Sequence, residues 1–115
     1  MLLFYNSDLL KAEDEATKNA LNSLESVFDT ISGRIIVAKV DVLTALGKKL
    51  MQVTNVDPEE ALLKPFLRIV DPNQSNNAIL KYKPEKEDNE PIGKDSIKNF
   101  VNDFVGGSLK KFLKT

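Results

Sequence analysis

Arg34–Val42, with the sequence RIIVAKVDV, is the stretch that decides the fold of this chain. It is continuous and rich in β-branched residues, which fit the pleated surface of a sheet better than a helix. A short apolar run without alternation is typical of a strand that is covered on both faces. We therefore predict a mostly buried strand over these residues, and we interpret the rest of the chain outward from it.

The residues before this strand predict one long amphipathic helix from Asp8 to about Ile31. At helical spacing its apolar residues form a single wide stripe, and Glu13 is the only charged residue inside that stripe. The stripe contains Leu9, Ala16, Ala20, Leu24, Val27, Phe28 and Ile31. Ser7 or Asp8 is the expected N-cap. Met1–Asn6 (MLLFYN) comes before the helix and predicts a further strand, buried on both faces.

The residues after the deciding strand predict a helix, a hairpin and a last helix. Thr44 to about Thr54 has apolar residues at helical spacing, with Thr44 as the candidate cap, and Asn55–Lys64 is expected to be a loop. Phe66–Val70 and Ala78–Lys83 predict two strands, joined by a run of turn-forming residues. From about Asp95 the apolar spacing is again helical, up to a pair of glycines.

The expected element order is therefore βαβαββα. Two crossovers through helices are expected to give parallel strands, and the hairpin adds an antiparallel edge. One four-stranded mixed sheet with helices on both faces would cover every apolar stripe. This is the minimal thioredoxin-like arrangement, and the amino-terminal domain of glutathione transferases shares it.

Composition excludes several classes of function. The chain has 16 basic and 17 acidic residues, and a net charge of −1 without a basic block argues against nucleic-acid binding. No apolar run approaches the roughly 20 residues of a membrane span. The absence of Cys and His removes thiol and imidazole chemistry. The carboxylates lie on solvated faces or in loops without converging partners, so we expect neither a metal site nor a cofactor.

Four stretches in chain order then resemble one family. Val37–Asp41 (VAKVD) resembles a strand end of thioredoxin-like domains, and Lys64–Ile69 (KPFLRI) lies where that fold keeps a cis-proline. Leu80–Glu85 (LKYKPE) resembles the hairpin arm of protein disulfide isomerases. Phe100–Lys110 (FVNDFVGGSLK) resembles their closing helix. The chain is similar to a non-catalytic thioredoxin-like domain of a protein disulfide isomerase, most closely the b′ domain.

The resemblance implies a domain that holds unfolded or partly folded polypeptide without covalent chemistry. Residues 1–107 would form the domain, without the usual first strand and helix, and residues 108–115 would lead into a linker. Asn6–Leu10 stands where catalytic domains have Cys-x-x-Cys, so this domain would not exchange disulfides. Catalytic thioredoxin domains of the same protein would do so, in the lumen of the endoplasmic reticulum.

The family's peptide-binding pocket predicts the site residues. By position its lining would be Leu24, Phe28, Ala38, Met51 and Val53. Methionine and other adaptable apolar side chains suit clients of many shapes. The alternative is that all five residues belong to the core. Leu109, Phe112 and Leu113 form a second candidate, as a tail that folds back over the pocket or that covers the last helix.

Three further expectations concern single features. Pro65 would follow a cis peptide bond, as implied by the resemblance. Asn73 begins the tripeptide Asn73-Gln74-Ser75, a glycosylation sequon in an exposed turn. Without the family's first strand, residues 34–42 would form an exposed apolar edge, through which two copies could associate.

Three other functions remain open. The domain could be a spacer that sets the distance between catalytic domains, or it could dock a folded partner chaperone through a charged face. The enzyme alternative is a glutathione-transferase-like domain, with Tyr5 or Ser7 holding a glutathione thiolate. That alternative needs a second helical domain and an acidic-serine turn, for which Asp95-Ser96 is a poor candidate.

Overall fold

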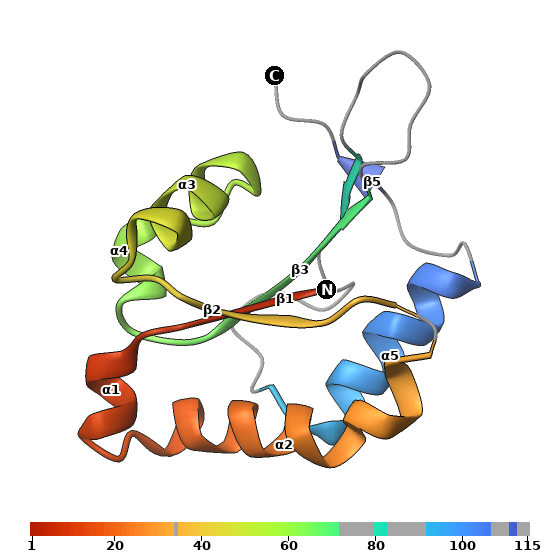
Figure 1. The fold of residues 1–115 in the computed structure, drawn as a ribbon, viewed down its shortest axis with the longest axis horizontal. Coiled ribbons are helices and arrows are strands. Elements are labelled where there is room, and N and C mark those ends of the chain that lie inside the picture. The colour runs from red at the N-terminus through yellow and green to blue at the C-terminus, as the bar shows by residue number, and fades with distance from the viewer. Residues whose placement is uncertain (34, 72–79, 83–91, 107–110, 113–115) are drawn as a thin grey trace.

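The architecture is mixed α/β, with helices and a twisted sheet (Figure 1). The structure, a computed structural model, describes residues 1–33, 35–71, 80–82, 92–106 and 111–112. The elements are β1 (Leu2–Tyr5), α1 (Ser7–Lys11), α2 (Glu15–Ile31), β2 (Ala38–Asp41), α3 (Ala45–Val53), α4 (Pro58–Ala61), β3 (Phe66–Asp71), β4 (Leu80–Tyr82), α5 (Lys94–Val105) and β5 (Lys111–Phe112).

The centre of the sheet is a three-stranded mixed unit of β2, β1 and β3. β1 pairs in parallel with β2, with Phe4 opposite Val40, and antiparallel with β3, with Phe4 opposite Phe66. Beyond this unit β3 pairs with the short β4, and β4 with β5, so the order is β2-β1-β3-β4-β5. The expected four-stranded sheet is therefore wrong in its extent, since the ladder continues into the predicted tail.

Only one of the two expected parallel crossovers is present. β2 ends at Asp41 opposite Tyr5, and β3 begins at Phe66 opposite Phe4, which is the same end of β1. The chain therefore leaves the sheet after β2 and returns to it in β3, after α3 and α4, at the same end of β1. A strand that starts at that end must run back antiparallel to β1, which corrects the expectation.

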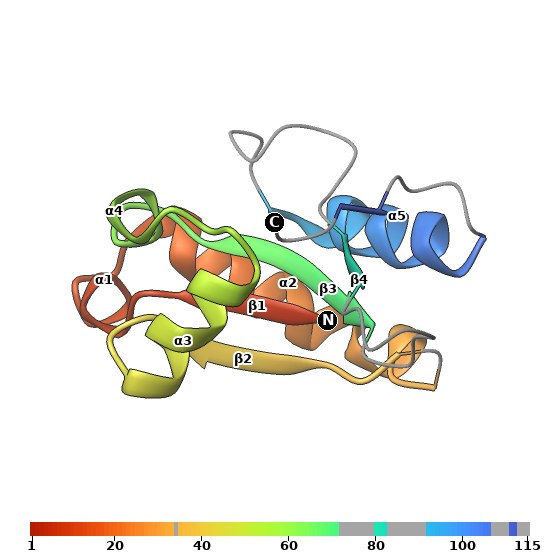
Figure 2. The ribbon, with the colours of Figure 1, turned by 90° about the horizontal axis from the view of Figure 1, so that it is seen from above.

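Two apolar cores lie on opposite faces of the sheet. Successive side chains of β1 point to opposite faces, so Leu3 joins the core under α2 and α5, while Phe4 joins the core under α3 and α4. Figure 1 shows α2 and α5 on one side of the sheet and α3 on the other. Figure 2 looks down on the sheet from the α3 side and shows β2, β1 and β3 side by side.

The single helix predicted from Asp8 is two helices. The side chain of Asn6 caps α1 by accepting a 2.9 Å hydrogen bond from the backbone N–H of Asp8. Glu13 then takes a φ of 61°, which no right-handed helix contains. The side chain of Asp14 starts α2 by accepting a 3.0 Å hydrogen bond from the N–H of Thr17. Two competing caps thus divide one amphipathic pattern.

β2 is shorter and more exposed than predicted. Only Ala38–Asp41 is strand, and of its first three residues only Val40 is buried. Ile36, just before the strand, is 88% exposed. β2 stands at one end of the strand order and has a neighbour on one side only. The expectation of a strand covered on both faces is therefore wrong, whereas the expected exposed edge is confirmed within the described sheet.

The helix after β2 begins where predicted, and the expected loop contains a further helix. The hydroxyl of Thr44 accepts a 2.9 Å hydrogen bond from the N–H of Gly47 and so caps α3. In the stretch predicted as a loop, the side chain of Asp57 caps α4, with Pro58 in the first turn. The later elements agree with the prediction: β3 and β4 pair antiparallel, and α5 buries Ile97 with two more residues of its stripe.

Candidate functional site

A hollow of about 430 Å³ lies between α2 and β2. We call it the α2–β2 hollow, and define it by its lining of Leu21, Leu24, Glu25, Phe28, Asp29, Val37, Ala38 and Lys39. Five of these residues come from α2 and three from β2 or the residue before it. The crossover from β1 through α2 to β2 therefore builds the whole site from one continuous part of the chain.

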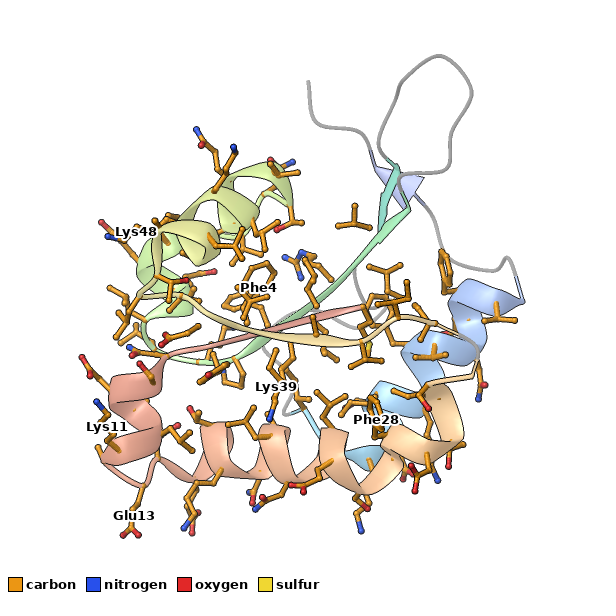
Figure 3. All side chains as sticks on the ribbon, in the orientation of Figure 1. Phe4, Lys11, Glu13, Phe28, Lys39 and Lys48 are labelled. Atoms are coloured by element: carbon orange, nitrogen blue, oxygen red, sulfur yellow. The ribbon has the colours of Figure 1, made fainter. Side chains whose placement is uncertain are left out.

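The apolar part of the hollow has a buried floor and an exposed rim. Leu24 is 3% exposed and belongs to the core under α2, whereas Phe28, one turn further along the helix, is 43% exposed. Leu21 and Val37 are partly buried and pack against the same core. Figure 3 shows Phe28 on the side of α2 that faces the sheet. Phe28 thus offers a large apolar surface at the entrance.

The rim also carries charge of both signs. Glu25 and Asp29 lie one helical turn apart on α2, and both are exposed. Lys39 is exposed on β2 and points toward α2 (Figure 3). The sequence analysis missed these three residues, because a charged residue beside an apolar stripe resembles an ordinary solvated position. Their spacing around Phe28 is the one signal that could have shown them.

The structure brings together three of the five predicted pocket residues. Leu24, Phe28 and Ala38 all line the α2–β2 hollow. Met51 is 2% exposed in the core on the opposite face of the sheet, and Val53 lies on the same helix as Met51. α2 and α3 cover different faces, so residues from these two helices do not share this hollow.

The predicted cis-proline is wrong. The described part of the chain includes both Lys64 and Pro65 and contains no cis peptide bond. The N–H groups of Leu63 and Lys64 donate to the carbonyl oxygen of Glu60, at 2.9 and 3.1 Å. This turn after α4 already redirects the chain into β3, and Pro65 follows it as a buried residue next to the first strand position.

The predicted glycosylation site and most of the predicted tail lie outside the described residues. Asn73 and its sequon fall outside them, as do Leu109 and Leu113 of the tail. Phe112 lies in β5, whose backbone pairs it with Lys81 of β4. The segment predicted to fold back over the pocket or to cover the last helix therefore contributes a strand at this point.

Asp41 links the end of β2 to the start of α1. Asp41 accepts hydrogen bonds at Oδ1 from the N–H of Leu43, at 3.1 Å, and from the N–H of Ser7, at 3.4 Å. Burial raises the pKa of Asp41, but hydrogen bonds from Ser7 and Leu43 and the charge of Lys11 outweigh it, so the pKa lies below its ordinary value. Ser7, the candidate glutathione ligand, is thus already a partner of Asp41.

Some backbone groups of β2 point away from β1 and have no strand beside them in the described sheet. The N–H of Ala38 donates to Met1 and the N–H of Val42 donates to Tyr5, both toward β1. Because backbone groups of successive strand residues point in opposite directions, those of Lys39 point outward. Within the described sheet no strand follows β2 on that side. The α2–β2 hollow therefore opens beside a strand edge.

Among the described residues, no group of three or more His, Cys, Asp or Glu side chains is arranged to hold a metal ion. None of the described helices is long and apolar enough to cross a membrane. The sequence matches no model of a known protein family and no curated protein.

Proposed function

We propose that this chain binds segments of unfolded or partly folded polypeptide, without covalent chemistry, at the α2–β2 hollow. The observation that carries the proposal is Phe28, 43% exposed at the entrance of a hollow with an apolar floor. A large aromatic side chain next to an apolar hollow is typical of a surface that a ligand covers. Three residues of the hollow, Leu24, Phe28 and Ala38, are also among those that the family resemblance implied for peptide binding.

We further propose that the domain is thioredoxin-like and belongs to a protein disulfide isomerase. Support comes from the parallel β1–β2 pair, the antiparallel β3 beside β1, and helices on both faces of the sheet. The proposal includes a location in the endoplasmic reticulum and catalytic domains elsewhere in the same protein. Those two parts rest on the sequence resemblance.

The expected affinity is weak. Complete burial of one apolar client side chain contributes about 1.5–3 kcal/mol. The loss of overall motion on association costs about 4–15 kcal/mol. One anchored side chain is therefore insufficient, and a client must make several contacts around the hollow. Weak, several-point binding suits a domain that must release clients of many sequences.

A titration monitored by NMR tests the proposal. An unstructured peptide rich in Leu and Phe is added to the labelled protein, and we expect shifts confined to Leu21–Asp29 and Val37–Lys39. Phe28→Ala should weaken binding about tenfold, because it removes the exposed ring at the entrance. Leu46→Ala is the matched control, since Leu46 is 64% exposed on α3 and does not line the hollow.

Each other outcome contradicts the proposal. An absence of shifts at millimolar peptide would indicate a spacer domain. Equal weakening by Phe28→Ala and Leu46→Ala would indicate non-specific adhesion to exposed apolar side chains. Shifts confined to α3 and α4 would indicate a different site.

A further inference from the structure

The α2–β2 hollow lies next to the outer edge of β2, the edge that is not paired with β1. Lys39 directs its backbone N–H and C=O away from β1, as argued above from the hydrogen bonds of Ala38 and Val42. The side chain of the same residue points toward α2 and lines the hollow (Figure 3). A strand added at this edge would therefore direct every second side chain into the α2–β2 hollow.

The spacing of charges on α2 matches the spacing of side chains on such a strand. Side chains on one face of a strand recur every two residues, or about 6.6 Å. Glu25 and Asp29 are four helical residues apart, which is a rise of about 6 Å. Figure 1 shows α2 running alongside β2, so the two repeats run in nearly the same direction. Leu24 and Phe28 are also four residues apart, so the apolar pair and the acidic pair each recur along the hollow at close to the two-residue repeat of a strand.

The charges of the rim favour a client segment with a basic side chain. Two carboxylates, Glu25 and Asp29, face one ammonium group, Lys39, around an otherwise apolar lining. A client with a basic residue two positions from an apolar residue would bury the apolar side chain beside Phe28 and place its cation near a carboxylate. A client with an acidic residue at that position would add a third negative charge.

We propose that the α2–β2 hollow binds an extended polypeptide segment as an added strand on β2, with an apolar and a basic side chain two residues apart. This inference rests on the proposed function and names the mode of binding and the class of client. A second copy of this chain is a poorer occupant, because its β2 would bring Asp41 to the same face as its Lys39. That carboxylate would lie close to Glu25 and Asp29.

Four synthetic peptides of ten residues test the mode of binding. The parent peptide carries alternating Leu and Lys on one strand face and Thr on the other. The second peptide has Glu in place of Lys, and the third and fourth carry N-methyl groups on either of the two alternating sets of backbone amides. Affinities are measured by calorimetry at low salt. We expect the Glu peptide to bind about fivefold more weakly than the parent, and the difference to shrink in 0.5 M salt.

The N-methylated pair distinguishes an added strand from an apolar contact alone. One set of amides would face β2 and the other would face solvent, so one methylated peptide should bind about tenfold more weakly than the other. In the protein, Glu25→Gln with Asp29→Asn should abolish the preference for Lys over Glu. Glu59→Gln with Glu60→Gln is the matched control, since these exposed carboxylates lie on α4.

Failure of the inference differs from failure of the proposed function. If all four peptides bind equally well and Phe28→Ala weakens all of them, the hollow is a simple apolar site and the added-strand mode is wrong. If none of the peptides binds, the proposed function is wrong as well. If the peptides bind only after dilution of a dimer, a second copy is the occupant of β2 and the inference is overturned.

Discussion

Gly47 shows how one residue fixes the connection between β2 and α3. It is buried in the first turn of α3, and a Cβ atom built on it would lie 2.1 Å from the carbonyl oxygen of Asp41. That oxygen also accepts hydrogen bonds from the N–H and the hydroxyl of Thr44. Glycine lowers helix propensity, and the sequence pattern alone suggested only that cost. The close approach to Asp41 is a tertiary contact, which no local pattern contains.

We therefore expect Gly47→Ala to destabilise the fold although alanine is the better helix former. The clash with backbone should cost about 2 kcal/mol, more than the roughly 1 kcal/mol gained in propensity. Unfolding by urea, followed by circular dichroism, measures the free energy of unfolding. Gly33→Ala is the control, since a Cβ at Gly33 meets no atom within 4 Å, and it should change stability little. Equal effects of the two substitutions would contradict the clash.

The helices and strands were predictable where apolar spacing and capping residues agree, and unpredictable where they indicate different boundaries. The strand–helix–strand unit around α2, the cap of α3 by Thr44 and the stripe of α5 follow from apolar spacing and capping residues. The break between α1 and α2 does not. Asn6 and Asp14 are both good caps, and the apolar stripe, which begins at Leu9, runs across Asp14. The apolar spacing alone therefore does not show that both caps are used.

The break gives a prediction for Glu13, whose φ of 61° lies in the left-handed region. Glycine adopts this conformation without the penalty that a side chain carries. Glu13→Gly should therefore raise the free energy of unfolding by up to about 1 kcal/mol. Glu15→Gly, two residues later in the first turn of α2, should lower it by a similar amount. If both variants lose stability in thermal and urea unfolding, the turn does not require a left-handed residue in solution.

At the scale of the whole molecule, the site could be predicted only in part. Leu24, Phe28 and Ala38 come from one crossover, and a crossover brings its helix against its own strands whatever the rest of the chain does. Met51 was assigned to the same pocket although α3 covers the opposite face of the sheet. Which face a helix covers depends on the side of the sheet on which the next strand is added, and β3 lies on the other side of β1 from β2. The sequence pattern had suggested a parallel β3, and the strand is antiparallel to β1.

The open edge of β2 leads to the last prediction, which concerns association between copies. Exposed strand edges favour pairing with other strands, and a charged residue such as Lys39 on the edge weakens this tendency. We expect a monomer at micromolar concentration and weak self-association near the millimolar range, visible by sedimentation and light scattering.

Lys39→Ala should strengthen this association, since antiparallel pairing of two β2 edges would bring the two Lys39 side chains together and the substitution removes their repulsion. Lys39→Pro should abolish it, because proline lacks the N–H that points outward while the N–H of Ala38 still donates to β1. Binding of the extended peptide should weaken as protein concentration rises, because the peptide and the second copy compete for one edge. A strict monomer at high concentration in the Lys39→Ala variant would contradict the prediction and show that the rest of the molecule already protects β2.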